Sequence, residues 1–257
     1  YKDTIVVASV SCIYGIGDIH IDSVVSKLKE RFKIDVTLDN IIIPYRETIR
    51  GQVTQRYKYK KQSGGHGQYG DVEMTFEPLH DYTVPFVFEE KIFGGAVPKA
   101  YFPAVEKGLV EATKHGILAQ YPVLGIKATL IDGSYHSVDS SEMAFKTATI
   151  MCFKEAMEKA KPALLEPFMT LHVYIDEQFT GDIMGHFNKK RARVMGSEIL
   201  EDGLIKITAE APQEEVMNYA VDLRAMTQGQ GFFDMEFLGY EFAPEHVAKR
   251  VIANHQQ

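Results

Sequence analysis

Residues 169–211, with the sequence MTLHVYIDEQFTGDIMGHFNKKRARVMGSEILEDGLIKITAEA, decide the fold of the last part of the chain. The stretch begins with alternating apolar residues over 169–175, which is the pattern of a half-buried strand. A helical pattern follows over 178–191. Two further strands are predicted on either side of Asp202-Gly203, a dipeptide that strongly favours a hairpin turn. The stretch therefore predicts the order strand, helix, strand, strand.

The residues after this stretch complete the pattern. A helix is predicted over 214–226, a strand over 232–242 and a terminal helix over 244–253. The resulting order βαββαβ is that of a ferredoxin-like domain. This order alone specifies no function.

The region before it, 46–166, is predicted to mix strands and helices. A basic strand leads into the glycine-rich residues 62–70 and then into a strand over 72–76. A helix is predicted over 103–115, because proline suits its first turn and Gly116 suits the position after its end. A strand over 123–131 follows.

The segment 132–136 is predicted to be a turn or loop, since Asp-Gly favours positive φ. Asp139 to Glu142 resembles a capping box with Asp139 as the cap, which predicts a long helix to about Ala160. The first 45 residues show a strand over 4–10, a helix over 19–32 and a strand over 34–38. This βαβ piece is thin for a domain, so we expect part of its fold to lie upstream of Tyr1.

Composition and charge bound the functional classes. The 257 residues are 45% apolar and 25% charged, which is ordinary for a globular protein. The net charge of −7 argues against a generic nucleic-acid coat. Cys12 and Cys152 form no metal-ligand spacing and no disulfide framework, which suits a reducing cytosol. No apolar run is long enough to span a membrane, so a cytoplasmic location is expected.

The glycine-rich stretch is the first candidate site. Its glycines permit close backbone approach, and successive N–H groups can cradle a phosphate. It is neither a Walker A loop nor a dinucleotide fingerprint. One interpretation is a flexible hairpin tip; the other is an RNA-backbone contact, favoured by neighbouring cations and aromatic residues. The residues concerned are Ser63, Gly64, Gly65, His66, Gly67, Gln68 and Tyr69, with the basic flank Arg56, Lys58, Lys60 and Lys61.

The second candidate is the segment before the long helix. Its ring side chains can stack on bases, and the helix N-terminus after it favours anions. A loop histidine is otherwise simply exposed. The residues are Gly133, Ser134, Tyr135, His136, Ser137, Val138 and Asp139.

The third candidate is the basic run Lys189, Lys190, Arg191 and Arg193. It either complements the C-terminal dipole of a helix or contacts a second anion, for which arginine is well shaped.

Two other classes of function stay open on the residues alone. His136, Asp139 and Glu142 form a conceivable metal or general-base cluster, although no nucleophile is evident nearby. The second open class is an interaction module that docks on a protein partner.

Several long motifs resemble, in order, the end of the third domain and the fourth and fifth domains of bacterial elongation factor G. The strongest are KKQSGGHGQYG at 60–70, FGGAVPK at 93–99, PAVEKG at 103–108 and DGSYHSVDSSEMAF at 132–145. Shorter ones are GIGDIH at 15–20, PYRETI at 44–49, LLEP at 164–167, GD at 181–182 and AVDLR at 220–224. The resemblance covers essentially the whole chain.

The resemblance implies an α+β fold in three parts. Residues 1–45 would be the second half of a ferredoxin-like third domain. Residues 46–166 would be the fourth domain, an elongated βαβ-type arm like the second domain of ribosomal protein S5. Residues 167–257 would be a ferredoxin-like fifth domain with a C-terminal helix.

The same resemblance implies the partners. The family is a translational GTPase that moves tRNA and mRNA through the ribosome. The two candidate loops would form the arm's tip at the small-subunit decoding region and contact the tRNA–mRNA duplex. Asn188, Lys189, Lys190, Arg191 and Arg193 would face large-subunit RNA. The chain would be a monomer that catalyses no reaction and holds no cofactor, with GTP and Mg²⁺ bound by an absent N-terminal domain.

Some positions depart from the family pattern. His66, His186, Gln230 and the pair Lys189-Lys190 stand where other residues are usual. These departures favour a divergent elongation factor G-like paralogue. Ribosome recycling and ribosome protection are the related alternatives.

Overall fold

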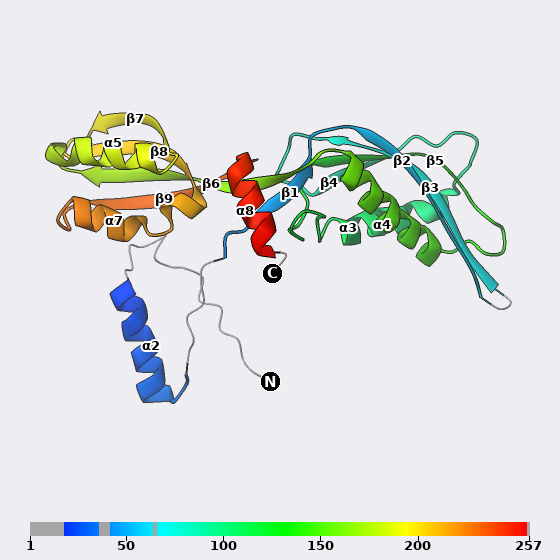
Figure 1. The fold of residues 1–257 in the computed structure, drawn as a ribbon, viewed down its shortest axis with the longest axis horizontal. Coiled ribbons are helices and arrows are strands. Elements are labelled where there is room, and N and C mark those ends of the chain that lie inside the picture. The colour runs from blue at the N-terminus through cyan, green and yellow to red at the C-terminus, as the bar shows by residue number, and fades with distance from the viewer. Residues whose placement is uncertain (1–17, 36–41, 64–65, 256–257) are drawn as a thin grey trace. The chain divides into compact units, whose positions relative to one another are not determined.

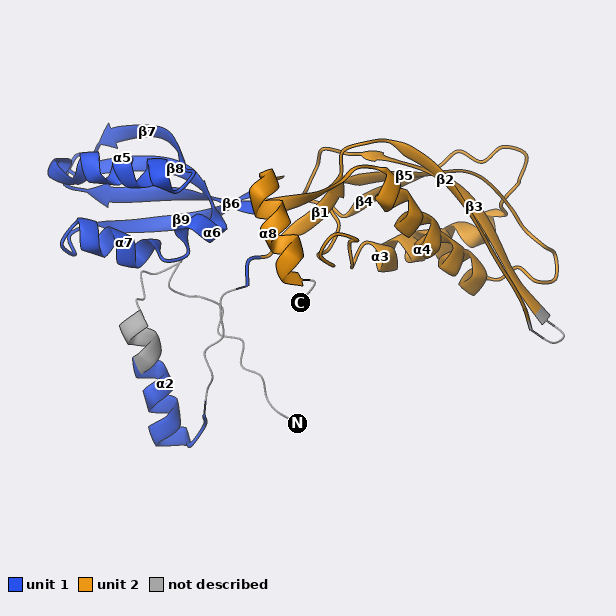
Figure 2. Ribbon diagram, viewed as in Figure 1, with its two compact units in different colours: residues 1–43, 167–239 blue, residues 44–166, 240–257 orange. Residues whose placement is uncertain are grey.

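The computed structural model describes residues 18–35, 42–63 and 66–255 (Figure 1). The chain divides into two compact units (Figure 2). Unit 1 comprises residues 1–43 and 167–239, and unit 2 comprises residues 44–166 and 240–257. The C-terminal helix, predicted as part of the domain from residue 167, is grouped with unit 2.

Unit 2 is built on a four-stranded sheet in the order β2-β3-β5-β4. The β2–β3 and β3–β5 pairs are antiparallel, and β4 runs parallel to β5. Figure 1 shows the β2–β3 hairpin reaching beyond the helices of this unit. The strands are β2 (Val53–Ser63), β3 (His66–Pro78), β4 (Phe86–Glu90) and β5 (Ile126–Ser134).

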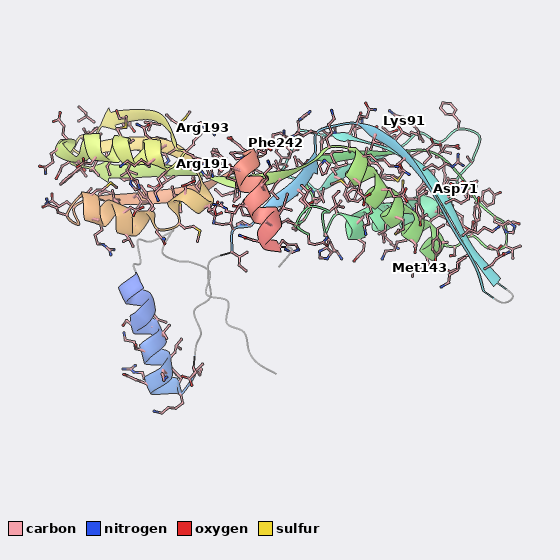
Figure 3. The ribbon with its side chains drawn as sticks, viewed as in Figure 1. Asp71, Lys91, Met143, Arg191, Arg193 and Phe242 are labelled. Carbon is pink, nitrogen blue, oxygen red and sulfur yellow. The ribbon has the colours of Figure 1, made fainter. Side chains whose placement is uncertain are left out.

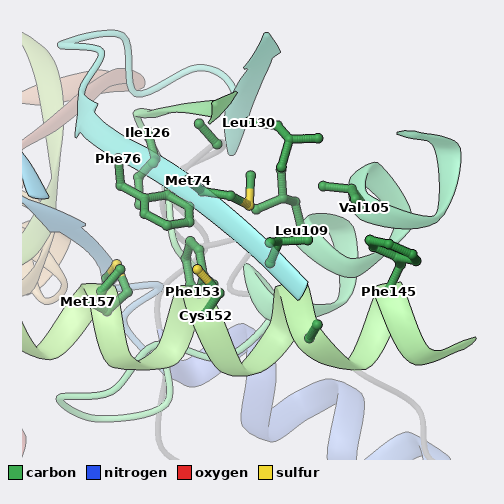
Figure 4. Close-up of a cluster of buried hydrophobic side chains, with 14 of the residues drawn as sticks. Met74, Phe76, Val105, Leu109, Ile126, Leu130, Phe145, Cys152, Phe153 and Met157 are labelled. Atoms are coloured by element: carbon green, nitrogen blue, oxygen red, sulfur yellow. The ribbon is translucent and has the colours of Figure 1, made fainter. Parts of the chain in front are cut away.

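The core of unit 2 lies between this sheet and two helices, α3 (Phe102–Ala112) and α4 (Glu142–Lys159) (Figure 4). Phe76 of β3 meets Phe153 of α4 edge to face, with ring centroids 5.6 Å apart. Cys152 is buried in the same core, and burial raises the pKa of its thiol to about 12. This thiol is therefore protonated and serves packing.

The buried carboxylate of Glu47, in β1 (Arg46–Ile49), organises a neighbouring loop. It accepts hydrogen bonds from the N–H groups of Leu118 and Ala119 at 2.8 Å and of Tyr121 at 3.2 Å. A Cβ on Gly116 would overlap the same carboxylate. Gly116 is thus needed for close approach, not as the predicted helix end, since α3 ends at Ala112.

The last residues of the chain complete unit 2. Helix α8 (Glu245–His255) follows a segment in which the Ala243 N–H donates to the Leu164 carbonyl at 3.0 Å. The Arg50 guanidinium lies 4.4 Å from the centroid of the Phe242 ring. Unit 2 is therefore built from two separate segments of the chain, and the second of them begins after residue 239.

Unit 1 confirms the predicted ferredoxin-like order. Its strands run β9-β6-β8-β7, and the hairpin between β7 and β8 turns at Asp202-Gly203, where Gly203 has a φ of +86°. The buried core comes from one face of this sheet and its helices. The elements are β6 (Pro162–Ile175), α5 (Thr180–Lys189), β7 (Arg193–Ile199), β8 (Ile205–Pro212), α6 (Gln213–Val216), α7 (Tyr219–Met226) and β9 (Phe232–Phe242). The first residues of β6 and the last of β9 belong to unit 2.

The N-terminal predictions fall partly outside the described residues. Helix α2 (Asp18–Phe32) confirms the predicted helix. The predicted strand over 4–10 and most of that over 34–38 lie outside the described ranges. Two short 3-10 helices, Lys99–Tyr101 and Glu177–Phe179, complete the elements of the described ranges.

Three other local predictions were wrong. Residues 132–134 continue β5 instead of forming a turn, because they pair with Asp71 to Glu73 of β3. Gly133 is needed for the close approach of these strands, since a Cβ there would overlap the carbonyl oxygen of Asp71. Ser141, not Asp139, caps α4, since its hydroxyl accepts the Ala144 N–H at 3.2 Å. The helix predicted over 214–226 is broken into α6 and α7 around Asn218.

The α+β fold class is confirmed in both units. None of the helices among the described residues has the length and apolarity needed to cross a bilayer.

Candidate nucleic-acid interface

Two distant segments meet at the end of the hairpin in unit 2. The Tyr69 N–H donates to the main-chain oxygen of Asp139 at 2.8 Å, and the Gly67 N–H donates to Asp139 Oδ1 at 3.0 Å. Tyr69 and Ser140 also form an isolated parallel bridge. We call the tip the described residues 60–63 and 66–70 together with residues 133–141. The structure thus joins the first two sequence-predicted candidate sites.

The glycines of the hairpin make this contact possible. A Cβ on Gly67 would lie 2.8 Å from Asp139 Cγ, and one on Gly70 would lie 2.5 Å from the Ala144 carbonyl oxygen. Neither residue has positive φ. Their role is therefore close backbone approach, while Gly64 and Gly65 lie outside the described residues.

His136 is held by its own segment. Its Nδ1 accepts the Asp139 N–H at 3.2 Å and the Val138 N–H at 3.4 Å, and its main-chain N–H donates to Ser140 Oγ at 2.9 Å. Asp139 Oδ2 also lies 3.4 Å from Nδ1. Backbone N–H groups can only donate, so these two contacts use Nδ1 as an acceptor, as in the tautomer whose proton is on Nε2. The ring can then donate to a ligand through Nε2.

A hollow of about 140 Å³ lies where the segments meet. The side chain of His136 is 54% exposed and its ring centroid lies 6.3 Å from that of Tyr69. Gln62 also contributes, although sequence analysis did not select it within the glycine-rich stretch. The lining residues are Lys60, Lys61, Gln62, Gly67, Gln68, Tyr69, His136 and Asp139.

Two of the four cations of the basic flank, Arg56 and Lys58, lie next to carboxylates on the sheet. Arg56 pairs with the fully buried Asp71 through Nε–Oδ1 at 3.0 Å and Nη2–Oδ2 at 2.7 Å. Asp132 and Glu73 lie 3.3 and 3.4 Å from Arg56 Nη1. Lys58 Nζ is 4.0 Å from Asp71 Oδ2. Much of the charge nearer the body of unit 2 is therefore balanced within the fold.

Lys60 and Lys61 differ from these two residues. In the part of the chain that the structure describes, neither lysine has a carboxylate within ion-pair distance. Both line the hollow. Within the basic flank, the cations available to an anion are therefore the two lysines of the tip.

Asp71 also connects the tip to the sheet (Figure 3). Ser134 Oγ donates to its Oδ2 and lies 2.7 Å from the Tyr69 hydroxyl. Burial alone would raise the pKa of Asp71, but the hydrogen bonds from Arg56 and Ser134 outweigh burial and lower it. Ser134 is thus a structural residue of β5, whereas sequence analysis assigns it to the contacting loop.

This lowered pKa predicts an acid-sensitive stability. The unfolded chain binds a proton at Asp71 near the usual carboxyl pKa of about 4. The folded state binds this proton only at a lower pH. The stabilisation is complete above that pH and is lost as the pH falls through the lowered pKa. Urea unfolding followed by circular dichroism from pH 6 to pH 2 should show this loss. Asp71→Asn should be less stable at pH 6 but lose less on acidification; an equally steep loss would contradict the assignment.

The third candidate site lies in unit 1, around the end of α5 (Figure 3). Arg191 Nε lies 2.9 Å from Glu215 Oε1, and Lys190 Nζ lies 3.4 Å from Asp222 Oδ2. Arg193 pairs with Glu210 at 3.0 Å. These cations are paired with acids, while Asn188 and Lys189 are exposed.

Two residues of the enzymatic alternative do meet, since His136 Nδ1 and Asp139 Oδ2 lie 3.4 Å apart. No group of three His, Cys, Asp or Glu side chains within the described ranges is arranged to hold a metal ion. The carboxylate of Asp139 is already engaged with the Gly67 N–H.

Comparisons with known proteins agree with this architecture. The family model "Elongation factor G, domain IV" matches residues 42–161, and "Elongation factor G C-terminus" matches residues 163–251. An elongation factor G-like protein of Thermotoga maritima is 42% identical over 240 residues, which are 93% of this chain and 35% of that protein. A crystal structure of a Thermus thermophilus protein matches with a TM-score of 0.86 and 39% identity, over 94% of this chain and 36% of that chain.

The chain spans about a third of the length of these two relatives. The two family models nevertheless cover most of its own residues. The chain therefore belongs to the elongation factor G family of translation factors.

Proposed function

We propose that the tip of unit 2 contacts RNA on the ribosome and supports movement of the tRNA–mRNA duplex through the small-subunit decoding region. The observation that carries this proposal is the meeting of two segments, about Lys60 and His136, around one hollow. Both carry motifs of the family. In this proposal residues 46–166 act as the fourth domain and residues 167–257 as the fifth.

The chemistry of the hollow suits a phosphate of an RNA backbone. Lys60 and Lys61 supply positive charge, and His136 supplies a ring N–H donor at Nε2. Tyr135, whose side chain is about half exposed, can stack on a base or sugar. Such contacts position the tip without reading a base sequence.

The chain catalyses no bond change in this proposal. GTP and Mg²⁺ belong to another part of the whole factor, and no cofactor is bound here. Unit 1 faces large-subunit RNA through Asn188 and Lys189, which are exposed beside the paired cations. The factor acts in the cytoplasm as a monomer.

Salt-dependent binding tests the proposal. The chain should co-sediment with ribosomes, and its affinity should fall as salt rises from 50 to 200 mM, because phosphate contacts release counterions. The slope of log affinity against log salt is negative. Replacing both Lys60 and Lys61 by glutamine should make it shallower by about 1.5. The pair Lys107→Gln and Lys154→Gln is the matched control, since both lysines are exposed on α3 and α4.

A slope unchanged by the tip variant would contradict RNA contact at the hollow. Salt-independent binding would instead favour docking on a ribosomal or other protein.

A further inference from the structure

We propose that Asp139 is a positioning residue of the tip, which acts by bracing residues 133–141 against β3 instead of touching RNA. The inference rests on the function proposed above and assigns how its site is held together. The brace would keep the lysines of β2 and the imidazole of His136 on one hollow.

Asp139 accepts two backbone hydrogen bonds from one edge of strand β3. Its main-chain oxygen accepts the Tyr69 N–H, and its Oδ1 accepts the Gly67 N–H. Residues two apart in a strand point their N–H groups to the same edge. Asp139 thus satisfies two successive donors on the free edge of β3, near the end of the hairpin.

Asp139 is available for this role because another residue caps α4. Ser141 accepts the Ala144 N–H, so the carboxylate three residues before Glu142 is not needed by the helix. The fit is specific as well, since a side chain at residue 67 would collide with the carboxylate. The Gly67–Asp139 pair is therefore a matched contact.

The charge of Asp139 argues for bracing over direct contact. The residue lines the hollow beside Lys60 and Lys61, where a carboxylate repels the phosphate that the lysines attract. Its oxygen is useful there as a hydrogen-bond acceptor. An amide side chain keeps such an acceptor and removes the charge, so asparagine and alanine separate the two roles.

The first measurement needs only this chain. Amide hydrogen exchange at Gly67, followed by NMR, should accelerate at least about tenfold in Asp139→Ala. Asp139→Asn should stay within about threefold of the wild type, because its amide oxygen replaces Oδ1. Glu142→Ala is the control, since it removes an equal charge three residues away without removing the contact. Unchanged exchange in Asp139→Ala would overturn the brace.

The second measurement is ribosome affinity by co-sedimentation. Asp139→Ala should bind about tenfold more weakly, since displaced donors lose their shared geometry. Asp139→Asn should bind as tightly as the wild type or more tightly. Equal weakening in both variants would assign the effect to the charge and overturn the positioning role.

The two measurements separate this inference from the proposed function. Fast exchange in Asp139→Ala with undiminished affinity overturns the positioning role. If the Lys60→Gln, Lys61→Gln variant then also binds normally, the proposed RNA contact fails as well.

A double-variant comparison adds a check on the contact itself. Gly67→Ala should weaken binding in the wild-type background, because its Cβ meets the Asp139 carboxylate. In the Asp139→Ala background the same change should have a smaller effect. Additive effects would contradict the matched contact.

Discussion

Replacing His136 by alanine in the whole factor is expected to slow translocation by roughly tenfold to a hundredfold. Two losses combine. The variant removes the Nε2 donor, and it removes the Nδ1 acceptor that the N–H groups of Val138 and Asp139 use to shape the segment. Rapid kinetics of tRNA–mRNA movement, measured beside GTP hydrolysis, checks this prediction.

GTP hydrolysis should continue at its normal rate, because the proposed site of His136 is separate from the nucleotide. His115→Ala is the control, since it removes an exposed imidazole of unit 2 that lies outside the tip. Wild-type translocation in His136→Ala would contradict the role of the tip. Loss of GTP hydrolysis would show that the residue acts elsewhere.

Replacing Glu47 by alanine is expected to lower the free energy of unfolding by about 3 to 5 kcal/mol. The change leaves the N–H groups of Leu118, Ala119 and Tyr121 without their acceptor. It also removes a fully buried side chain next to Gly116. Urea unfolding followed by circular dichroism measures the difference.

Glu111→Ala is the matched control for this prediction. Glu111 is an exposed carboxylate that pairs with Lys114 at the surface, so its loss should change stability far less than the loss of Glu47. Glu47→Gln should fall between the two, because one acceptor oxygen remains. Equal effects of Glu47→Ala and Glu111→Ala would contradict the role of Glu47 as the acceptor that holds this loop.

Local signals in the sequence were sufficient for much of the fold. The two-residue alternation around Asp202-Gly203 predicted the β7–β8 hairpin, and the positive φ of Gly203 is the reason for glycine there. The resemblance of Asp139 to Glu142 to a capping box likewise predicted a long helix, and the structure confirms α4 from Glu142 to Lys159. Both features depend on residues close in sequence.

The errors arise where distant residues decide. The sequence predicts Gly133 as a turn residue. In the structure it is needed because the Asp71 backbone approaches closely across the β3–β5 pair and leaves no room for a Cβ. Arg56 reads as a free cation, yet it meets Asp71 and Asp132, which are 15 and 76 positions away. The register of paired strands, which periodicity does not reveal, determines both.

The candidate site was predictable in its parts but not in its assembly. The glycine-rich stretch and the segment before α4 were both selected from their composition. The contact of Asp139 with Gly67 and Tyr69 joins residues about 70 positions apart, and Asp139 itself resembled a helix cap. Sequence spacing offers no sign of such a contact.

Site-specific cross-linking tests the central claim most directly. A photoreactive phenylalanine analogue at Tyr135, whose side chain is 51% exposed, should cross-link to decoding-region RNA, mRNA or tRNA when the whole factor is bound to ribosomes. The same analogue at Ile199, 78% exposed in unit 1, is the control and should not label those RNAs. A bound factor whose tip probe labels none of them would contradict the account.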